Sequence, residues 1–319
     1  MVTMPQNKFS SAAVIGTGMM GPGIALSLAG GGLKCTLVSR TSDGAAQGLA
    51  KARAQAELLV HHGLLDEAAG AEALSRIAGS SHFDESVAGA DLVVESGPED
   101  MAWKQELFAR MDAIAPPGTV LASNTSGLSI TAIASCSARP ERVLTTHFWN
   151  PPHLMPLVEI VQGERTSPAL VDSVRDLLSA CDKTPVVVRK DRPGQLGNRL
   201  QMALVREAVN IIAEGIADAE AVDTVAKNGF GLRMPAYGIL EHQDIAGLDL
   251  GMRVVDYVTH DLRNEPGAPP LMRELVNAGQ LGVKTGRGFY DWQVKSADEV
   301  RSRRDAFLIE VLQYRKSKG

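Results

Sequence analysis

Two ionisable side chains, His147 and Glu159, stand in the segment HFWNPPHLMPLVEIV (147–161), near the ends of neighbouring extended runs. An imidazole titrates near neutral pH, so it can take the proton of a hydroxyl group while a carboxylate holds the ring. Removal of a hydride from the same carbon needs a cofactor that accepts it. We therefore expect His147 and Glu159 to form the catalytic dyad of a hydride-transfer enzyme.

A glycine-rich loop near the N-terminus has the form of a dinucleotide-binding site. It follows an apolar strand, Ala12–Ile15, and opens a helix of small residues. The first glycine permits a tight turn, the second lets the pyrophosphate approach the backbone, and the third lets helix and strand pack closely. The free N–H groups of the helix start then face the phosphates. The predicted cofactor-binding residues of this loop are Gly16, Gly18, Met19, Met20 and Gly21.

The end of the next strand, Cys35–Val38, bears on the choice of nicotinamide cofactor. An acidic residue there would bind the ribose 2′-hydroxyl and repel a 2′-phosphate. Ser39 stands at that position and Arg40 follows it. A hydroxyl beside a guanidinium suits a 2′-phosphate, so the sequence favours NADP(H). The alternative is NAD(H), with Arg40 stacked on the adenine and Asp43 or the backbone on the ribose.

Polar side chains also follow two later strands, at the edge of the sheet where doubly wound folds bind their ligands. Glu99 and Lys104 come after one strand, and Ser126 comes after the next. Each also has an ordinary structural interpretation, as a helix-start acid, a surface lysine and a helix cap. Asn198 could likewise be a simple helix-start residue.

Alternating strand and helix patterns predict an α/β fold with a doubly wound parallel sheet. We expect a Rossmann-type domain over residues 1–190, with a helical insertion near 45–77 that projects beyond the sheet. An all-helical domain over 191–319 follows the polar connector at 189–198. The candidate strands are Ala12–Ile15, Cys35–Val38, Leu92–Glu95, Val120–Ser123, Val143–Thr146, Leu157–Val161 and Pro185–Val188. The later helices are expected near 198–214, 219–228, 236–246, 249–262, 270–278 and 296–319.

Composition agrees with a globular enzyme in the cytoplasm that binds a small-molecule substrate: 45% of residues are hydrophobic, 22% are charged, and the net charge is −5. Lys and Arg are scattered, which argues against nucleic acid or a membrane as partner. The uncharged run 12–32 contains several glycines and Pro22, so it does not predict a spanning helix. Cys35, Cys136 and Cys181 have no metal-ligand spacing and are expected to be reduced thiols, with no metal bound.

Six motifs occur in order along the chain: GTGMMGPGIA, LVVES-x-PED, ASNTSGL, HFWNPPHLMPLVEIV, D-x-PGQLGNRL and KTGRGFYDW. Together they resemble the 3-hydroxyacyl-CoA dehydrogenase family from about residue 10 to residue 292. The resemblance implies that Glu99 and Lys104 lie near the nicotinamide ribose. It also implies a homodimer formed through the C-terminal domain.

The same resemblance assigns roles around the dyad. His147 would be the catalytic base and Glu159 would hold it. Ser126 and Asn198 would contact the substrate oxygen or the base, and Asn150 would support the site.

Parts of the chain are similar to the branch that contains L-gulonate 3-dehydrogenase and carnitine dehydrogenase, which oxidise free 3-hydroxy acids. The supporting segments include NPPHLMPLVE, NRLQMALVREA and NGFGLRMPAYGILE. Arg233 in the last segment is then a candidate partner for a substrate carboxylate. The KTGRGFYDW segment instead resembles the acyl-CoA branch, so thioester and free acid both stay open. Imine reduction and a non-catalytic, crystallin-like role are the remaining alternatives.

Overall fold

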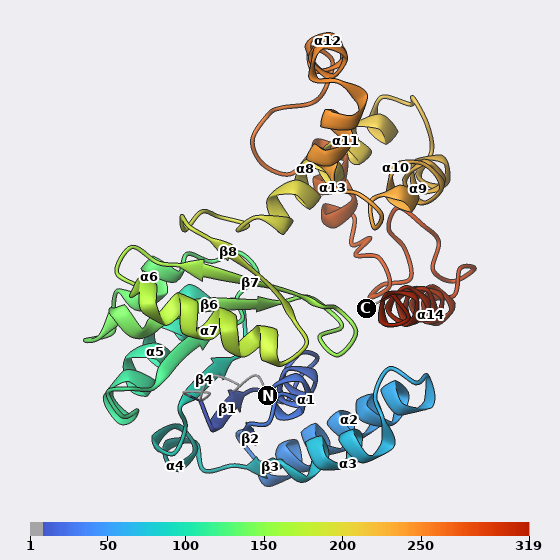
Figure 1. The fold of residues 1–319 in the computed structure, drawn as a ribbon. Helices are drawn as coiled ribbons and strands as arrows, with labels where there is room; N and C mark the ends of the chain where they lie inside the picture. Colours follow the sequence, from blue (N-terminus) through green and yellow to red (C-terminus); the bar gives the residue numbers. More distant parts are fainter. Residues whose placement is uncertain (1–8, 319) are drawn as a thin grey trace. The chain divides into compact units, whose positions relative to one another are not determined.

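The computed structural model describes residues 9–318, and the chain divides into two compact units. The first unit contains the described residues up to Asn198 and those from Arg303 onward, and the second contains Arg199–Ser302. Figure 1 traces the elements of both units along the chain. The sequence placed a boundary at residue 190, near the start of the 189–198 connector, whereas the units separate at its last residue.

The first unit contains an eight-stranded sheet with the order β3-β2-β1-β4-β5-β6-β7-β8. Neighbours from β3 to β6 pair in parallel, while β7 pairs antiparallel with β6 and parallel with β8. This is the mostly parallel, doubly wound sheet that the sequence predicted. The strands are β1 (Ser11–Ile15), β2 (Lys34–Val38), β3 (Ile77–Ser80), β4 (Leu92–Glu95), β5 (Val120–Ser123), β6 (Val143–Phe148), β7 (Leu157–Gln162) and β8 (Thr184–Val188).

Helices cover both faces of this sheet because its strands are apolar on both sides. In β1, Ala12 and Val14 join a core with α1 and α7, while Ala13 and Ile15 join a second core with α5 and α6. The two layers can be followed in Figure 1. The helices of this part are α1 (Gly21–Gly30), α2 (Ser42–His61), α3 (Glu67–Ser75), α4 (Phe83–Ala88), α5 (Met101–Ile114), α6 (Ile130–Ala134), the 3₁₀ turn η1 (Pro140–Arg142) and α7 (Pro168–Ala180).

The predicted helical insertion at 45–77 needs correction. It is two helices, α2 and α3, followed by a strand, β3, which includes Ile77 and pairs with β2. The insertion does not simply project beyond the sheet, because α2 and α3 both pack against α1 and α2 also packs against β3. The strand escaped prediction because its sequence, IAGS, has one β-branched residue and a glycine, which gives a weak strand pattern.

The second unit is helical, as predicted. Its helices are α8 (Gly197–Ala213), which begins in the first unit, α9 (Ala219–Asn228), α10 (Phe230–Arg233), α11 (Ile239–Ala246), α12 (Leu248–Val258), α13 (Pro270–Asn277) and the start of α14 (Ala297–Lys316). A capping side chain starts α9, where the Asp218 carboxylate accepts the backbone N–H of Ala221.

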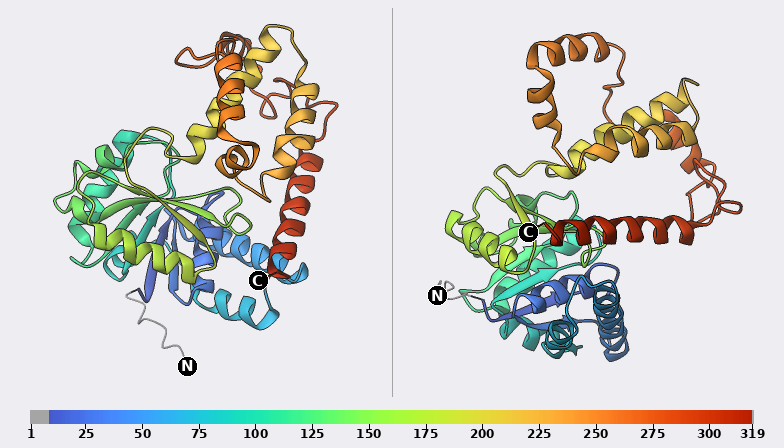
Figure 2. Two further views of the ribbon diagram at one scale, coloured as in Figure 1. Left: turned by 45° about the horizontal axis from the view of Figure 1, so that its top comes forward. Right: turned by 45° about the vertical axis from the view of Figure 1, so that its right-hand side comes forward.

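The C-terminal part of α14 belongs to the first unit, which corrects the predicted extent of the second domain to residue 319. The Gln313 amide donates to the His62 carbonyl at 2.6 Å, and the Lys316 ammonium donates to the Gly63 carbonyl at 3.2 Å. Figure 2 shows this end of α14 beside the turn between α2 and α3. The charged sequence of the helix gave no indication of which unit its few apolar side chains would contact.

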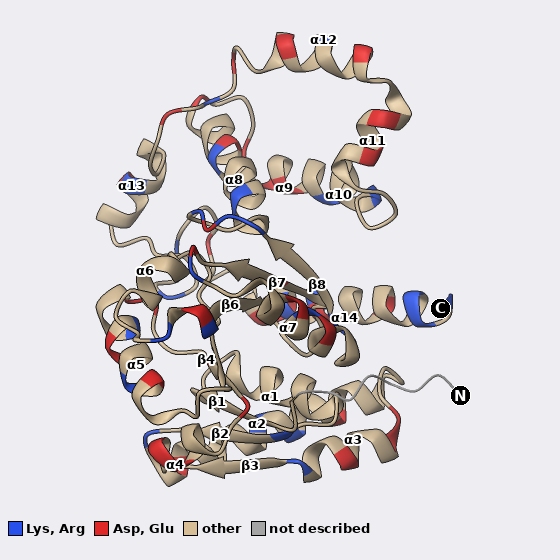
Figure 3. Cartoon of the chain, turned by 60° about the vertical axis from the view of Figure 1, so that its left-hand side comes forward, with Lys and Arg blue, Asp and Glu red and all other residues tan. Residues whose placement is uncertain are grey.

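Charged residues of both signs are interspersed along the helices, as Figure 3 shows. No helix within residues 9–318 combines the length and apolarity needed to cross a membrane. In the same range, no group of three or more His, Cys, Asp and Glu side chains is arranged to hold a metal ion. Cys35 and Cys181 are buried, and burial raises the pKa of each thiol to about 12.

Candidate active site

The glycine loop joins β1 to α1 where the strand order reverses, between β1 and β4. Gly16 has a φ of 112°, which favours glycine, and a Cβ atom there would overlap the Ser96 carbonyl. A Cβ atom at Gly21 would overlap the Gly16 carbonyl, whereas no protein atom lies within 4 Å of that position at Gly18. Gly16 thus makes the turn, Gly21 permits close packing and Gly18 borders open space.

This loop fits a dinucleotide pyrophosphate. Open space lies beside Gly18, and the first N–H groups of α1 lack intrahelical partners, as at any helix start. Met19 is 70% exposed next to that space, while Met20 packs against the core of the first unit. The loop has the shape that the sequence predicted.

The residues expected to select the cofactor lie beside the glycine loop. The Ser39 hydroxyl accepts a hydrogen bond of 3.5 Å from the Thr17 hydroxyl, and the Ser39 backbone N–H donates to the Ser80 carbonyl. Arg40 is exposed. The Lys51 ammonium donates to the Thr17 carbonyl at 3.2 Å, which adds a second positive charge at this end of the loop.

His147 and Glu159 face each other across the antiparallel pair β6–β7, where they are direct partners in the strand register. Nδ1 of His147 lies 2.8 Å from Oε2 of Glu159. The two residues are only 7% and 1% exposed, respectively. Because the carboxylate occupies Nδ1, Nε2 is the ring nitrogen that can exchange a proton with a substrate.

Glu159 is held as a carboxylate although it is buried. Burial raises its pKa, but hydrogen bonds from His147, the Gly197 and Leu196 amides and the Trp149 indole outweigh burial and hold the pKa below the usual value. The two amides lie 2.8 and 3.0 Å from Oε1 and belong to the start of α8. The buried negative charge therefore faces N–H donors and an imidazole that can accept a proton.

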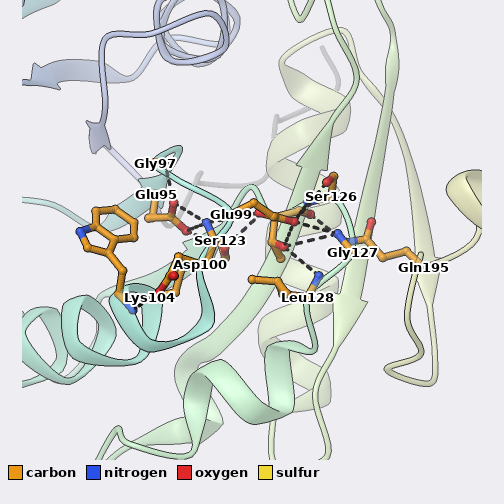
Figure 4. Close-up of polar contacts among 12 residues, drawn as sticks. Glu95, Gly97, Glu99, Asp100, Lys104, Ser123, Ser126, Gly127, Leu128 and Gln195 are labelled. Atoms are coloured by element: carbon orange, nitrogen blue, oxygen red, sulfur yellow. Dashed lines mark hydrogen bonds and ion pairs between the residues drawn. The ribbon is translucent and has the colours of Figure 1, made fainter. Parts of the chain in front are cut away.

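A second buried carboxylate, Glu95, ends β4. The Lys104 ammonium contacts both of its oxygens, at 2.6 and 2.7 Å, and the Ser123 hydroxyl donates to it at 2.6 Å. Figure 4 shows these side chains together at the ends of β4 and β5. Lys104 is 1% exposed and lies in the first turn of α5, which the Asp100 side chain caps. It is thus bound to Glu95 beneath the site surface, and it also lies 3.7 Å from the more exposed Glu99.

Glu99 organises the loop after β5. Its Oε1 accepts the Thr125 hydroxyl at 2.6 Å, the Ser126 hydroxyl at 3.1 Å and the backbone N–H groups of Ser126 and Gly127 at 3.0 and 3.1 Å (Figure 4). Lys104 lies 3.7 Å from the other oxygen. Burial raises the pKa of Glu99, but the Thr125 hydrogen bond, Lys104 and the Ser126 hydrogen bonds lower it overall.

The other predicted site residues are Asn198, Asn150 and Arg233, and each has different surroundings. Asn198 donates its amide to the Ser126 carbonyl at 2.7 Å, so it supports the loop that carries the Ser126 hydroxyl. Asn150 is exposed and precedes a cis bond to Pro151. Arg233 is exposed in the second unit, where its guanidinium lies 3.3 Å from Nε2 of His242.

Three residues of this region were not identified from the sequence. Glu95 ends an apolar strand, LVVE, and an acid in that position was the available signal. Trp149 follows His147 by two residues and lies beside Glu159. Gln195 is buried with a φ of 55° and donates to the Thr125 carbonyl at 2.8 Å, a contact that only the folded connector creates.

Comparison with known families covers both units. Residues 11–192 match the model described as 3-hydroxyacyl-CoA dehydrogenase, NAD binding domain. Residues 194–292 match the 3-hydroxyacyl-CoA dehydrogenase, C-terminal domain.

Among curated relatives, a 5-formyl-3-hydroxy-2-methylpyridine 4-carboxylate 5-dehydrogenase of Mesorhizobium japonicum is 35% identical over 94% of this chain and 96% of its own length. A probable 3-hydroxybutyryl-CoA dehydrogenase of Bacillus subtilis is 38% identical over 89% and 98%. An L-carnitine dehydrogenase of Streptomyces griseus is 34% identical over 94% and 88%.

A crystal structure of the same pyridine-carboxylate dehydrogenase activity, described as an NAD+ dependent dismutase, superposes with a TM-score of 0.88. It covers 95% of this chain and 97% of its own, at 32% sequence identity.

Proposed function

Because the chain belongs to the 3-hydroxyacyl-CoA dehydrogenase family, we propose that it interconverts a hydroxyl and a carbonyl group at C3 of a 3-hydroxyacyl-CoA or a free 3-hydroxy acid. The observation that carries this proposal is the 2.8 Å contact between His147 and Glu159 in a unit that also has the dinucleotide loop. A general base held by a carboxylate is the group that removal of a hydroxyl proton requires.

In the oxidative direction, Nε2 of neutral His147 accepts the proton of the 3-hydroxyl group, while Nδ1 keeps its hydrogen bond to Glu159. A bound nicotinamide supplies the hydride chemistry. Glu159 then stabilises the positive charge that forms on the imidazole. In the reductive direction, protonated His147 returns the proton. We propose that the Ser126 hydroxyl, whose hydrogen points to Glu99 in this structure, turns to the carbonyl oxygen of the substrate and polarises it, on a loop that Glu99 and Asn198 hold.

Substitution of His147 by alanine tests this assignment. We expect kcat to fall by about 10²–10⁴-fold, the usual contribution of a general base, with cofactor affinity retained. His260→Ala, an exposed histidine in the second unit, is the matched control and keeps full activity. An unchanged kcat in H147A would remove His147 from the reaction.

A second candidate substrate is a free acid with a ring and a formyl or hydroxyl group. The structural match that favours it has a TM-score of 0.88, whereas a 3-hydroxybutyryl-CoA dehydrogenase of Ralstonia eutropha has 0.74. Assays with acetoacetyl-CoA, a free 3-keto acid and a pyridine carboxylate that bears a formyl group separate the classes. Turnover of the thioester alone would eliminate both acids. Imine reduction is a further arm of the same assay.

For the cofactor we propose a preference for NADP(H) over NAD(H), on the basis of Ser39 and the exposed Arg40 beside the glycine loop. Calorimetric titration with NADPH and NADH gives the two affinities. Arg40→Ala is expected to weaken NADPH binding about tenfold, equivalent to about 1.4 kcal/mol, and to leave NADH binding nearly unchanged. Equal losses for both cofactors would mean that Arg40 only contacts the adenine.

We also propose that the protein forms a homodimer through its second unit. Large apolar side chains there are strongly exposed, among them Leu240 and Ile245 at 78% and Tyr257 at 84%. Exposed apolar side chains in such number mark interaction surfaces. Light scattering after size-exclusion chromatography measures the mass, and Tyr257→Glu is expected to shift a dimer toward monomer. A wild-type protein that is monomeric at all concentrations would contradict the proposal.

A further inference from the structure

Both oxygens of the Glu159 carboxylate are fully occupied. Oε1 accepts the Leu196 and Gly197 amides, and Oε2 accepts both His147 and the Trp149 indole N–H, at 2.8 and 3.1 Å. A carboxylate offers about four lone-pair positions, so these donors saturate it. The imidazole therefore shares its oxygen with a second donor.

The Trp149 ring is held firmly in this position. It follows β6, two residues after His147, and two residues apart in an extended chain point to the same side. Its ring centroid lies 5.4 Å from that of His147. The ring also abuts Gly197, where a Cβ atom would overlap it. The indole N–H is consequently aimed at one oxygen, and an indole can only donate.

We propose that Trp149 is a positioning residue that sets the base strength of His147 by sharing Oε2 of Glu159. The proposal rests on the proposed role of His147 and adds a residue to which no role is yet assigned. The indole N–H offsets part of the negative charge on Oε2. The carboxylate therefore stabilises the protonated form of His147 less strongly than it would without the indole. It also fixes the carboxylate so that Oε2 faces Nδ1.

Trp149→Phe keeps an aromatic ring at this position and removes the donor. Without the indole, Oε2 interacts more strongly with the imidazolium form, so a higher pH is needed to keep His147 neutral. In the oxidative direction we expect the rising limb of kcat/KM against pH to move upward by about 0.5–1 unit, the equivalent of one hydrogen bond. On the acid side of the wild-type limb, kcat/KM falls by the matching factor of about 3–10.

The matched control is Trp292→Phe, the same chemical change in the second unit, which should leave the pH profile unmoved. A role in packing alone predicts that W149F lowers the melting temperature or raises KM with the limb at its wild-type pH. That result, or a limb that moves to lower pH, would overturn the proposal.

A second measurement is made on the wild-type protein and needs no variant of Trp149. In ¹⁵N-tryptophan-labelled wild-type protein, the indole N–H resonance of Trp149 should titrate with the same midpoint as the kinetic limb. The spectra of Trp103→Phe and Trp292→Phe assign the other two signals. A Trp149 resonance that ignores this midpoint contradicts the coupling. If no substrate is turned over, the proposed function fails, while a resonance shift over the dyad titration still tests Trp149.

Discussion

Two buried carboxylates near the same edge of the sheet have different partners. Glu95 is paired with the ammonium of Lys104, and both side chains are at most 1% exposed. Glu159 is equally buried, but its donors are two amides, an indole and an imidazole. The charge of Glu95 is therefore compensated within the fold, whereas that of Glu159 can stabilise a proton that binds reversibly to His147. The first carboxylate anchors structure, and we propose that the second takes part in the reaction.

The largest effect on stability is expected when the buried ion pair between Lys104 and Glu95 is broken. Lys104→Met leaves Glu95 buried without a cation, and removal of one partner of a buried ion pair costs about 3–5 kcal/mol. Urea denaturation measures the loss. Lys227→Met, which breaks an exposed pair with Asp223, should cost less than about 1 kcal/mol.

The double variant E95Q/K104M sharpens this test. Removal of both charges should recover much of the stability that K104M loses, since no unpaired charge stays buried. If the double variant is no more stable than K104M, packing of the lysine chain rather than charge compensation accounts for the loss.

The dyad should respond in activity more than in folding. Glu159→Gln keeps the shape of the side chain but removes the charge that stabilises protonated His147, so we expect kcat to fall by roughly 100-fold, about 2.7 kcal/mol. Steady-state kinetics and cofactor titration give both quantities. A loss of cofactor affinity with normal kcat would mean that Glu159, like Glu95, has a structural role.

The smallest effect is on acid stability. The pKa of Glu159 is lower in the folded protein than its usual value of 4.5, so the ionised group stabilises the fold above that pH. This contribution is lost as the pH falls through the folded pKa. As the pH falls below that usual value, the wild type should therefore lose stability more steeply than E159Q, measured by denaturation at each pH. Parallel curves would show that Glu159 titrates alike in folded and unfolded chains.

The sequence predicted the elements whose residues carry their own pattern. Seven strands were found because buried parallel strands are continuous apolar runs, and β3 was missed because IAGS is not one. The dyad was predicted because His147 and Glu159 stand near the ends of neighbouring extended segments. In the structure these segments form an antiparallel pair, which sets His147 opposite Glu159.

Contacts that depend on packing between elements were not predictable. Lys104 looked like a cofactor ligand or a surface lysine, and only the docking of α5 beneath β4 brings its ammonium to Glu95. For Asn198 the sequence predicted a contact with the substrate oxygen or the base, but it gave no sign that the folded connector brings its amide to the Ser126 carbonyl. The pairing of a side chain with a distant backbone group has no periodicity that a sequence reveals.

The return of α14 to the first unit has a consequence for biosynthesis. The ribosome delivers residues 199–302 before the segment from Arg303 that completes the nucleotide-binding unit. Until then the α2–α3 turn lacks Gln313 and Lys316, and Leu59 and Leu64, which border a cavity with Leu312, lack that cover. The N-terminal unit is thus begun first but completed last, so a nascent chain stalled before residue 303 would expose a partly uncovered cofactor domain to chaperones and proteases.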